Sequence, residues 1–390
     1  MAPSPCTPCW SSACPPARRA RPGPVVWTHA PLGDALVDGT PSDLDVGADN
    51  DGAAGALDTG PGRQGPKLAI GYFPLSQALS RDQAFAKVKE VADVVLIQRH
   101  WQESSNEGGL DFHAAAGAAV AAARVAGLQV YLALEPLSVN RDRVELPAGL
   151  TGDFGTPAVR TAYVDLVTRV AADYRPDYFL INIEVNRYRN RNPTDYRNYL
   201  SLFRVAYAAI KGVSPGTRVA ASLSYEDVNG TDCFDAEDRD HFEGALAELG
   251  QQDFAAISLY PFCYFQPARI PESLLHEITQ STPLPILISE TAWVSESFPV
   301  TDQFTFESSP QMQSEYVDKL AALVRYAVDH GRAVAGVVYV SLIDMDAATC
   351  DLLTRVNPSL SWYCSLSLLD REGAAKPAFG ALEAWHDSMR

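Results

Sequence analysis

Two glutamates at the ends of apolar segments are the residues best suited to chemistry in this sequence. Glu184 ends the segment "YFLINIE" and Glu290 ends "LPILISE". Tyr260 ends a third such segment, "FAAISLY". Two carboxyl groups that face one another can divide a reaction between them, because one can donate a proton while the other attacks or activates water. The sequence therefore predicts a carboxylate-based site if the fold brings these segment ends together.

Aromatic and polar residues gather at the same kind of segment end. Cleavage of a glycosidic bond needs a carboxylic acid to protonate the leaving oxygen and a second carboxylate to act at the anomeric carbon. Aromatic rings can cover the apolar faces of sugar rings and still offer a polar atom. Each aromatic residue also has a plain packing interpretation. The candidate substrate-binding residues are Arg99, His100, Trp101, Asn186, Tyr260 and Trp293.

Other hydrolytic chemistries fit the sequence less well. A metal-dependent hydrolase would need several histidine or aspartate ligands at strand ends. Of the seven histidines, only His100 stands at such a position. A serine nucleophile on a G-x-S-x-G turn is also missing from the sequence. We therefore expect neither a metal ion nor an organic cofactor.

Eight apolar segments of strand length alternate with helical patterns from residue 67 onward. This alternation predicts an α/β fold, a (β/α)8 barrel over 67–390. A doubly wound open sheet is the alternative, but the glycine-rich phosphate turn that it would need is missing. In a barrel, Glu184 would end the fourth strand and Glu290 the seventh, on opposite sides of one mouth. The expected strands cover 67–73, 92–98, 128–134, 177–183, 217–224, 254–260, 284–290 and 333–341.

The first part of the chain has a different composition. Residues 1–66 are rich in Asp, Gly and Ala and almost free of aromatic residues, which predicts a disordered, low-complexity acidic linker or export region. The charge of −17, from 31 basic and 48 acidic residues, argues against a nucleic-acid partner. No apolar run approaches the ~20 residues of a membrane-spanning helix. We expect a monomer that is secreted or tethered at the cell surface.

Four cysteines stand in loop-like segments of the predicted barrel. They are Cys233, Cys263, Cys350 and Cys364. Two disulfides in an oxidising compartment are one interpretation, and four free thiols are the other. Pairing of Cys233 with Cys263 and of Cys350 with Cys364 is the preferred arrangement.

Four motifs together resemble a known clan of enzymes. They are "INIEVN" (181–186), "SLYPF" (258–262), "ILISETAW" (286–293) and "SLLDREGAAKPAFGALEAW" (367–385). They resemble the retaining (β/α)8 glycoside hydrolases, including endo-β-galactanases and β-glucanases, that carry catalytic glutamates on strands four and seven. The resemblance implies Glu184 as acid/base, Glu290 as nucleophile and a hydrogen bond from Tyr260 to Glu290. Retention would require a carboxyl separation of ~5 to 5.5 Å.

The sequence departs from the clan pattern at two positions. Ile183 stands where the clan usually has an asparagine before the acid/base glutamate, and Asn182 should point away from the mouth, so Asn186 is the expected substitute. The eighth strand offers Tyr339 in place of a common tryptophan. Because of these differences, the sequence does not identify the sugar of the substrate. We expect cleavage of β-linked polysaccharides or oligosaccharides with retention; the alternative is an inactive barrel that binds carbohydrate at a surface.

Overall fold

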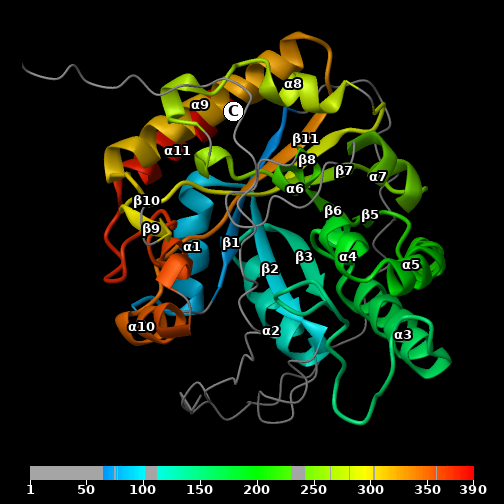
Figure 1. The fold of residues 1–390 in the computed structure, drawn as a ribbon. Coiled ribbons are helices and arrows are strands. Elements are labelled where there is room, and N and C mark those ends of the chain that lie inside the picture. Colours follow the sequence, from blue (N-terminus) through cyan, green and yellow to red (C-terminus); the bar gives the residue numbers. More distant parts are fainter. Residues whose placement is uncertain are drawn as a thin grey trace, which may run out of the picture. The chain divides into compact units, whose positions relative to one another are not determined.

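A computed structural model describes residues 65–390, except for 74, 75, 77, 102–111, 230–241, 264, 281, 302, 303 and 357 (Figure 1). The linker expected over 1–66 lies outside these residues apart from its last two positions. Cys233 also lies outside them.

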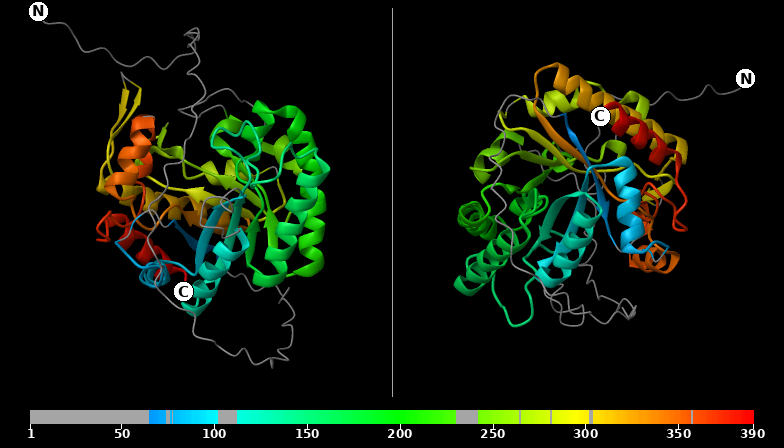
Figure 2. Two further views of the ribbon diagram at one scale, coloured as in Figure 1. Left: turned by 90° about the horizontal axis from the view of Figure 1, so that it is seen from below. Right: turned by 180° about the vertical axis from the view of Figure 1, so that it is seen from behind.

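A parallel sheet closes on itself and forms the centre of the fold (Figures 1 and 2). Its strand order is β5-β4-β3-β2-β1-β11-β8-β7-β6. The two strands at the ends of this order, β5 and β6, are separated only by Ala221, so together they are the fifth strand of a ring of eight. The predicted (β/α)8 barrel is confirmed. The strands are β1 (Lys67–Tyr72), β2 (Val94–His100), β3 (Gln129–Glu135), β4 (Tyr178–Leu180), β5 (Arg218–Ala220), β6 (Ser222–Ser224), β7 (Ala255–Ser258), β8 (Ile286–Thr291) and β11 (Val334–Tyr339).

Side chains fill the barrel from its amino-terminal end. Strands buried on both faces read as continuous apolar runs, and alternate residues point inward. The rings of Tyr131, Tyr178 and Phe254 pack edge to face across the interior, with centroids 6.0 and 6.1 Å apart. Ile183 belongs to the same interior cluster. Apolar side chains therefore fill this part of the barrel interior.

Helices cover the outside of the barrel (Figure 2). Gly127 follows the helix Phe112–Val125 with φ 71°, the left-handed conformation that glycine adopts without strain. Thr156 is the N-cap residue of α3, but its hydroxyl bonds Asp153 rather than the helix. The larger helices are α1 (Arg81–Val91), α2 (Phe112–Val125), α3 (Pro157–Tyr174), α5 (Pro193–Val213), α7 (Phe242–Leu249), α8 (Leu274–Thr279), α9 (Pro310–Asp329) and α11 (Pro377–Ser388).

Short elements follow several strand ends, and the sequence periodicity did not predict them. The segment after β8 contains an antiparallel hairpin of β9 (Phe298–Thr301) and β10 (Phe304–Phe306). Three further helices also stand at this end: α4 (Val185–Arg191), α6 (Tyr225–Asn229) and α10 (Ala347–Val356). A 3-10 segment, η4 (Pro358–Cys364), follows α10.

Candidate active site

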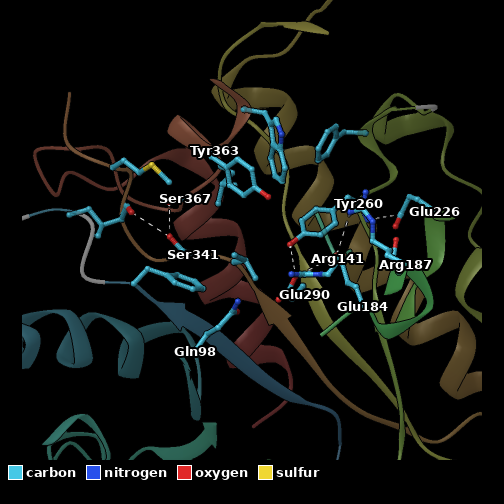
Figure 3. Close-up of a pocket in the computed structure, with 18 residues that line it drawn as sticks. Gln98, Arg141, Glu184, Arg187, Glu226, Tyr260, Glu290, Ser341, Tyr363 and Ser367 are labelled. Atoms are coloured by element: carbon cyan, nitrogen blue, oxygen red, sulfur yellow. Dashed lines mark hydrogen bonds and ion pairs between the residues drawn. The ribbon is translucent and has the colours of Figure 1, made fainter. Parts of the chain in front are cut away.

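A pocket lies at the carboxyl-terminal ends of the strands, where the barrel argument expects one (Figure 3). Its volume is about 270 Å³, close to the lower end of the roughly 300–1,000 Å³ common for ligand pockets. The strand ends that contribute to it supply Gln98, Glu184, Ser224, Tyr260, Glu290 and Val340. Glu184 and Glu290 are far apart in the sequence, and the fold brings both to this one pocket.

Glu184 reaches the pocket through an unusual turn of the backbone. Its φ of 50° and ψ of 48° are left-handed, and its N–H donates to Ser222 Oγ at 3.0 Å. A left-handed residue other than glycine costs on the order of 1 kcal/mol or more, and such residues cluster at functional sites. The turn ends the fourth strand, and α4 begins at the next residue. Arg141 and Arg187 each place a guanidinium nitrogen 3.5 Å from Glu184 Oε2.

Glu290 lies on β8 on the other side of the pocket. The hydroxyl of Tyr260 donates a hydrogen bond to Glu290 Oε2 at 3.2 Å, so the expected contact is present. Burial, followed by the nearby carboxylate of Glu184, raises the pKa of Glu290 to about 8. Because Glu184 contributes to this shift, the two carboxyl groups titrate as a coupled pair that holds a proton at neutral pH.

A third carboxyl group lies directly behind Glu184. Glu135 ends β3, and its Oε2 is 2.9 Å from Arg141 Nη2. Glu135 is only 2 % exposed, and this burial raises its pKa to about 7 in spite of the arginine. Arg141 therefore stands between two carboxyl groups, those of Glu135 and Glu184. Glu135 directly follows the expected strand over 128–134, whereas no pattern in the sequence singles out Arg141, which lies in a loop.

Ion pairs and a backbone contact link the ends of the fourth, fifth and sixth strands. Arg187, on α4, pairs with Asp227 Oδ2 at 3.0 Å through its Nε. The backbone N–H of Tyr260 donates to Glu226 Oε1 at 2.6 Å. These contacts fix the side of the pocket that carries Tyr260 and Glu184.

Aromatic side chains of η4 form another part of the lining. Trp362 and Tyr363 stack with their centroids 3.7 Å apart, and Trp362 meets Tyr260 edge to face at 5.8 Å. Tyr363 is 38 % exposed, so its ring is available to a ligand. Figure 3 shows Gln98, Ser341 and Ser367 on the side of the pocket opposite Glu184. Ser341 and Ser367 share a hydrogen bond of 2.8 Å between their hydroxyls.

Three of the expected substrate-binding residues pack in the interior instead. Trp101 is 3 % exposed and contacts Tyr163, while Trp293 is fully buried against Tyr316. A position just after a strand end does not by itself turn a large side chain toward the mouth, because helices and loops cover that end. Asn186 is also fully buried and bonds both backbone groups of Ser224, at 2.8 and 3.0 Å.

Arg99 and His100 are partly buried on β2, and neither lines the pocket. Gln98 lines it from the same strand. Asn182 is buried, and its Oδ1 accepts a hydrogen bond from the backbone of Ile183 at 2.8 Å, whereas Ile183 points into the barrel. Asn182 does not line the pocket. Asn186, expected to replace the missing asparagine, instead ties α4 to β6.

The predicted Cys350–Cys364 disulfide is confirmed. It joins α10 to the end of η4, next to the aromatic lining of the pocket. The second expected pair, Cys233 with Cys263, involves a residue outside the described part of the chain. Within the described residues, no three histidine, cysteine, aspartate or glutamate side chains are arranged to hold a metal ion. In the same part of the chain no helix has the length and apolarity to cross a membrane.

The fold and the pocket define a class of structure, the (β/α)8 barrel with two glutamates at the ends of strands four and seven. No protein family model matches the sequence, and a search of curated proteins also found no match. Solved structures, in contrast, are clearly similar in fold. The chain shares the barrel of glycoside hydrolases from several families.

Three solved structures illustrate this similarity. A GH5_18 protein from Streptomyces cattleya, in complex with GlcNAc, has a TM-score of 0.61 at 16 % identity, over 84 % of this chain and 81 % of that one. A GH5_18 variant from Bifidobacterium longum, in complex with Manβ1-4GlcNAc, has a TM-score of 0.60 at 17 % identity, over 83 % and 78 %. The GH53 catalytic domain of Ignisphaera aggregans has a TM-score of 0.54 at 16 % identity, over 82 % and 91 %.

Proposed function

We propose that this chain is a glycoside hydrolase that cleaves β-glycosidic bonds with retention of configuration. The observation that carries the proposal is the convergence of Glu184 and Glu290, from the fourth and seventh strands, on one pocket. The hydrogen bond from Tyr260 to Glu290 supports it further. The similarity in fold to glycoside hydrolases makes the same chemistry the most economical interpretation.

In this mechanism Glu290 attacks the anomeric carbon while Glu184 protonates the departing glycosidic oxygen. A covalent glycosyl-enzyme forms on Glu290. Glu184, now a carboxylate, then removes a proton from water, which attacks the anomeric carbon and releases Glu290. Each step inverts the anomeric centre once, so the product retains the configuration of the substrate.

The first step needs one proton across the pair, held by Glu184, with Glu290 ionised. Two interacting carboxyl groups titrate as a pair rather than as separate sites. The pKa of about 8 at Glu290 means that the pair holds a proton at neutral pH. Substrate binding must therefore place that proton on Glu184. Tyr260, as a donor to Glu290 Oε2, stabilises the ionised form of Glu290 that the attack requires.

We propose a β-linked oligosaccharide or polysaccharide as the substrate. The stacked rings of Trp362 and Tyr363 offer an apolar surface of the kind that covers sugar rings. The Ser341 and Ser367 hydroxyls, with the amide of Gln98, offer partners to sugar hydroxyls on the opposite side (Figure 3). Two of the similar structures hold GlcNAc or Manβ1-4GlcNAc, so manno-configured and N-acetylglucosamine-containing β-linkages belong in any test. The disulfide favours an oxidising, extracytoplasmic location.

The test is release of reducing sugar from a panel of β-linked glycans by the wild type, Glu290→Gln and Glu383→Gln. Glu383 is exposed on α11 and serves as the matched control. We expect the wild type and the control to be active on at least one glycan. Loss of the nucleophile should lower the rate at least 10³-fold. If none of the three proteins releases sugar while the wild type still binds a glycan, the chain is a carbohydrate-binding barrel and the proposal is wrong.

A further inference from the structure

A Glu135–Arg141 ion pair adjoins Glu184, with Glu135 buried and Arg141 in the lining of the pocket (Figure 3). Glu135 Oε2 and Glu184 Oε2 are 2.9 and 3.5 Å from the same nitrogen, Arg141 Nη2. The Glu135 side chain is 1 % exposed and that of Arg141 is 12 % exposed, so water screens their interactions only weakly. The catalytic steps described above use neither residue, although both are in direct electrostatic contact with the proposed acid/base.

The loop that carries Arg141 is held firmly. Arg141 has a φ of 53°, another left-handed residue that is not glycine. Leu137 and Val144 form an antiparallel bridge across the loop, and Glu145 N–H donates to the Pro136 carbonyl at 2.8 Å.

The same loop is bonded to the helices that follow Glu184. Asn192 Nδ2 donates to the Asp142 carbonyl at 3.2 Å, and Arg191 donates to the carbonyl of Asn140. Arg141 and Glu184 are therefore positioned relative to one another through the backbone as well as through their ion pair.

Several charged groups act on this pair. Glu135 is influenced by Arg141, Glu184 and Glu145, and it lies near Tyr163. Arg141 is influenced by Glu135, Glu184, Arg187 and Glu290. The arginine charge is already balanced by carboxylates, which argues against a binding site for an anionic sugar. A role in controlling the neighbouring carboxyl group fits these contacts better.

We propose that Glu135 and Arg141 are positioning residues that act through Glu184. Arg141 orients the carboxylate of Glu184, and Glu135 limits how strongly the guanidinium of Arg141 stabilises the charged form of Glu184. This inference rests on the proposed function. Without Glu135, the positive charge of Arg141 would interact with Glu184 alone on this side. Glu184 would then bind its catalytic proton less strongly. Without Arg141, Glu184 would lose a cation and hold the proton to higher pH. Changing both residues would leave the net charge behind Glu184 close to that of the wild type.

The test is the pH dependence of kcat/KM for Manβ1-4GlcNAc, or for the glycan of the panel that is cleaved fastest. The basic limb of this profile reports loss of the proton that the Glu184–Glu290 pair must hold for the first step. We expect Glu135→Gln to move the limb to lower pH and Arg141→Met to move it to higher pH, each by about 0.5 to 1 pH unit. The double variant should return the limb to within about 0.3 pH unit of the wild type. Arg143→Met is the matched control, because Arg143 lies on the same loop but is exposed and pairs with Asp142 and Glu145.

A purely structural role would give a different result. It would lower kcat or the melting temperature in all variants and leave the limb in place, and that outcome would overturn the inference. Shifts of both single variants in the same direction would also overturn it. An inactive wild type would overturn the proposed function and this inference together, whereas an active wild type with unmoved limbs would overturn the inference alone. The double variant keeps the test informative if a single variant folds poorly, since it contains no uncompensated buried charge.

Discussion

Burial of Glu290 opposes its ionisation, and this effect should be measurable in the stability of the protein as well as in catalysis. Its pKa in the folded chain is raised to about 8, mainly by burial. A carboxyl group whose folded-state pKa is raised stabilises the fold fully only below its unfolded pKa of about 4.3, and this contribution is lost as pH rises through the folded value. Between about pH 4.5 and 8 the wild type should therefore lose stability that a neutral side chain would keep.

Glu290→Gln should then melt at a higher temperature than the wild type at pH 8.5, by about 1 to 3 °C. The difference should shrink toward zero at pH 4.5. Thermal unfolding followed by circular dichroism at both pH values measures it, with the exposed Glu383→Gln as the control for a general effect of charge. A difference that is the same at both pH values would contradict the raised pKa.

The two candidate glutamates and Tyr260 could be found from the sequence because each ends an apolar segment, and strand ends converge in a barrel. Arg141, Trp362 and Tyr363 could not be found in this way. They lie on irregular segments, whose path depends on tertiary contacts rather than on hydrophobic periodicity. Trp293 shows the reverse error, since it follows a strand end but turns into the core.

At the scale of elements, the junction between the fourth strand and α4 decides where Glu184 points. Asn186 clamps this junction through two hydrogen bonds to the backbone of Ser224 on β6. Asn186→Ala would leave a buried N–H and a buried carbonyl without partners, at a cost of about 1 to 3 kcal/mol each. We therefore expect a loss of about 2 to 6 kcal/mol in the free energy of unfolding. KM should change little, because Asn186 does not line the pocket.

Urea unfolding and steady-state kinetics of Asn186→Ala test this role. Asn198→Ala is the matched control, because that side chain makes one hydrogen bond, to Asp195, and none to a strand. Its loss should be about 1 kcal/mol or less. A large rise in KM with unchanged stability would restore Asn186 as a substrate contact.

The strands of the barrel were predictable, and the small elements at its mouth were not. Each strand is buried on both faces, so it leaves a run of apolar residues in the sequence. The helix α4 and the β9–β10 hairpin have only a few residues each and no sustained periodicity.

At the scale of the whole molecule, closure of the parallel sheet is what makes a site out of distant residues. The order of the strands places the fourth and seventh on different sides of one mouth, so Glu184 and Glu290 line a common pocket. The similarity to solved glycoside hydrolase structures extends to this barrel fold. The proposed mechanism gives the two glutamates different roles.

Azide rescue measures those roles most directly. Glu184→Ala and Glu290→Ala are incubated with azide and the 4-nitrophenyl β-glycoside that the wild type cleaves fastest, and the anomeric configuration of each glycosyl azide is read by NMR. Without the acid/base, the glycosyl-enzyme still forms on Glu290, and azide attacks it to give the β-azide. Without the nucleophile, azide attacks in place of Glu290 and gives the α-azide. We predict the β-azide from Glu184→Ala and the α-azide from Glu290→Ala. The reverse pattern, or no azide product from either variant of an active wild type, would contradict the proposed roles of the two glutamates.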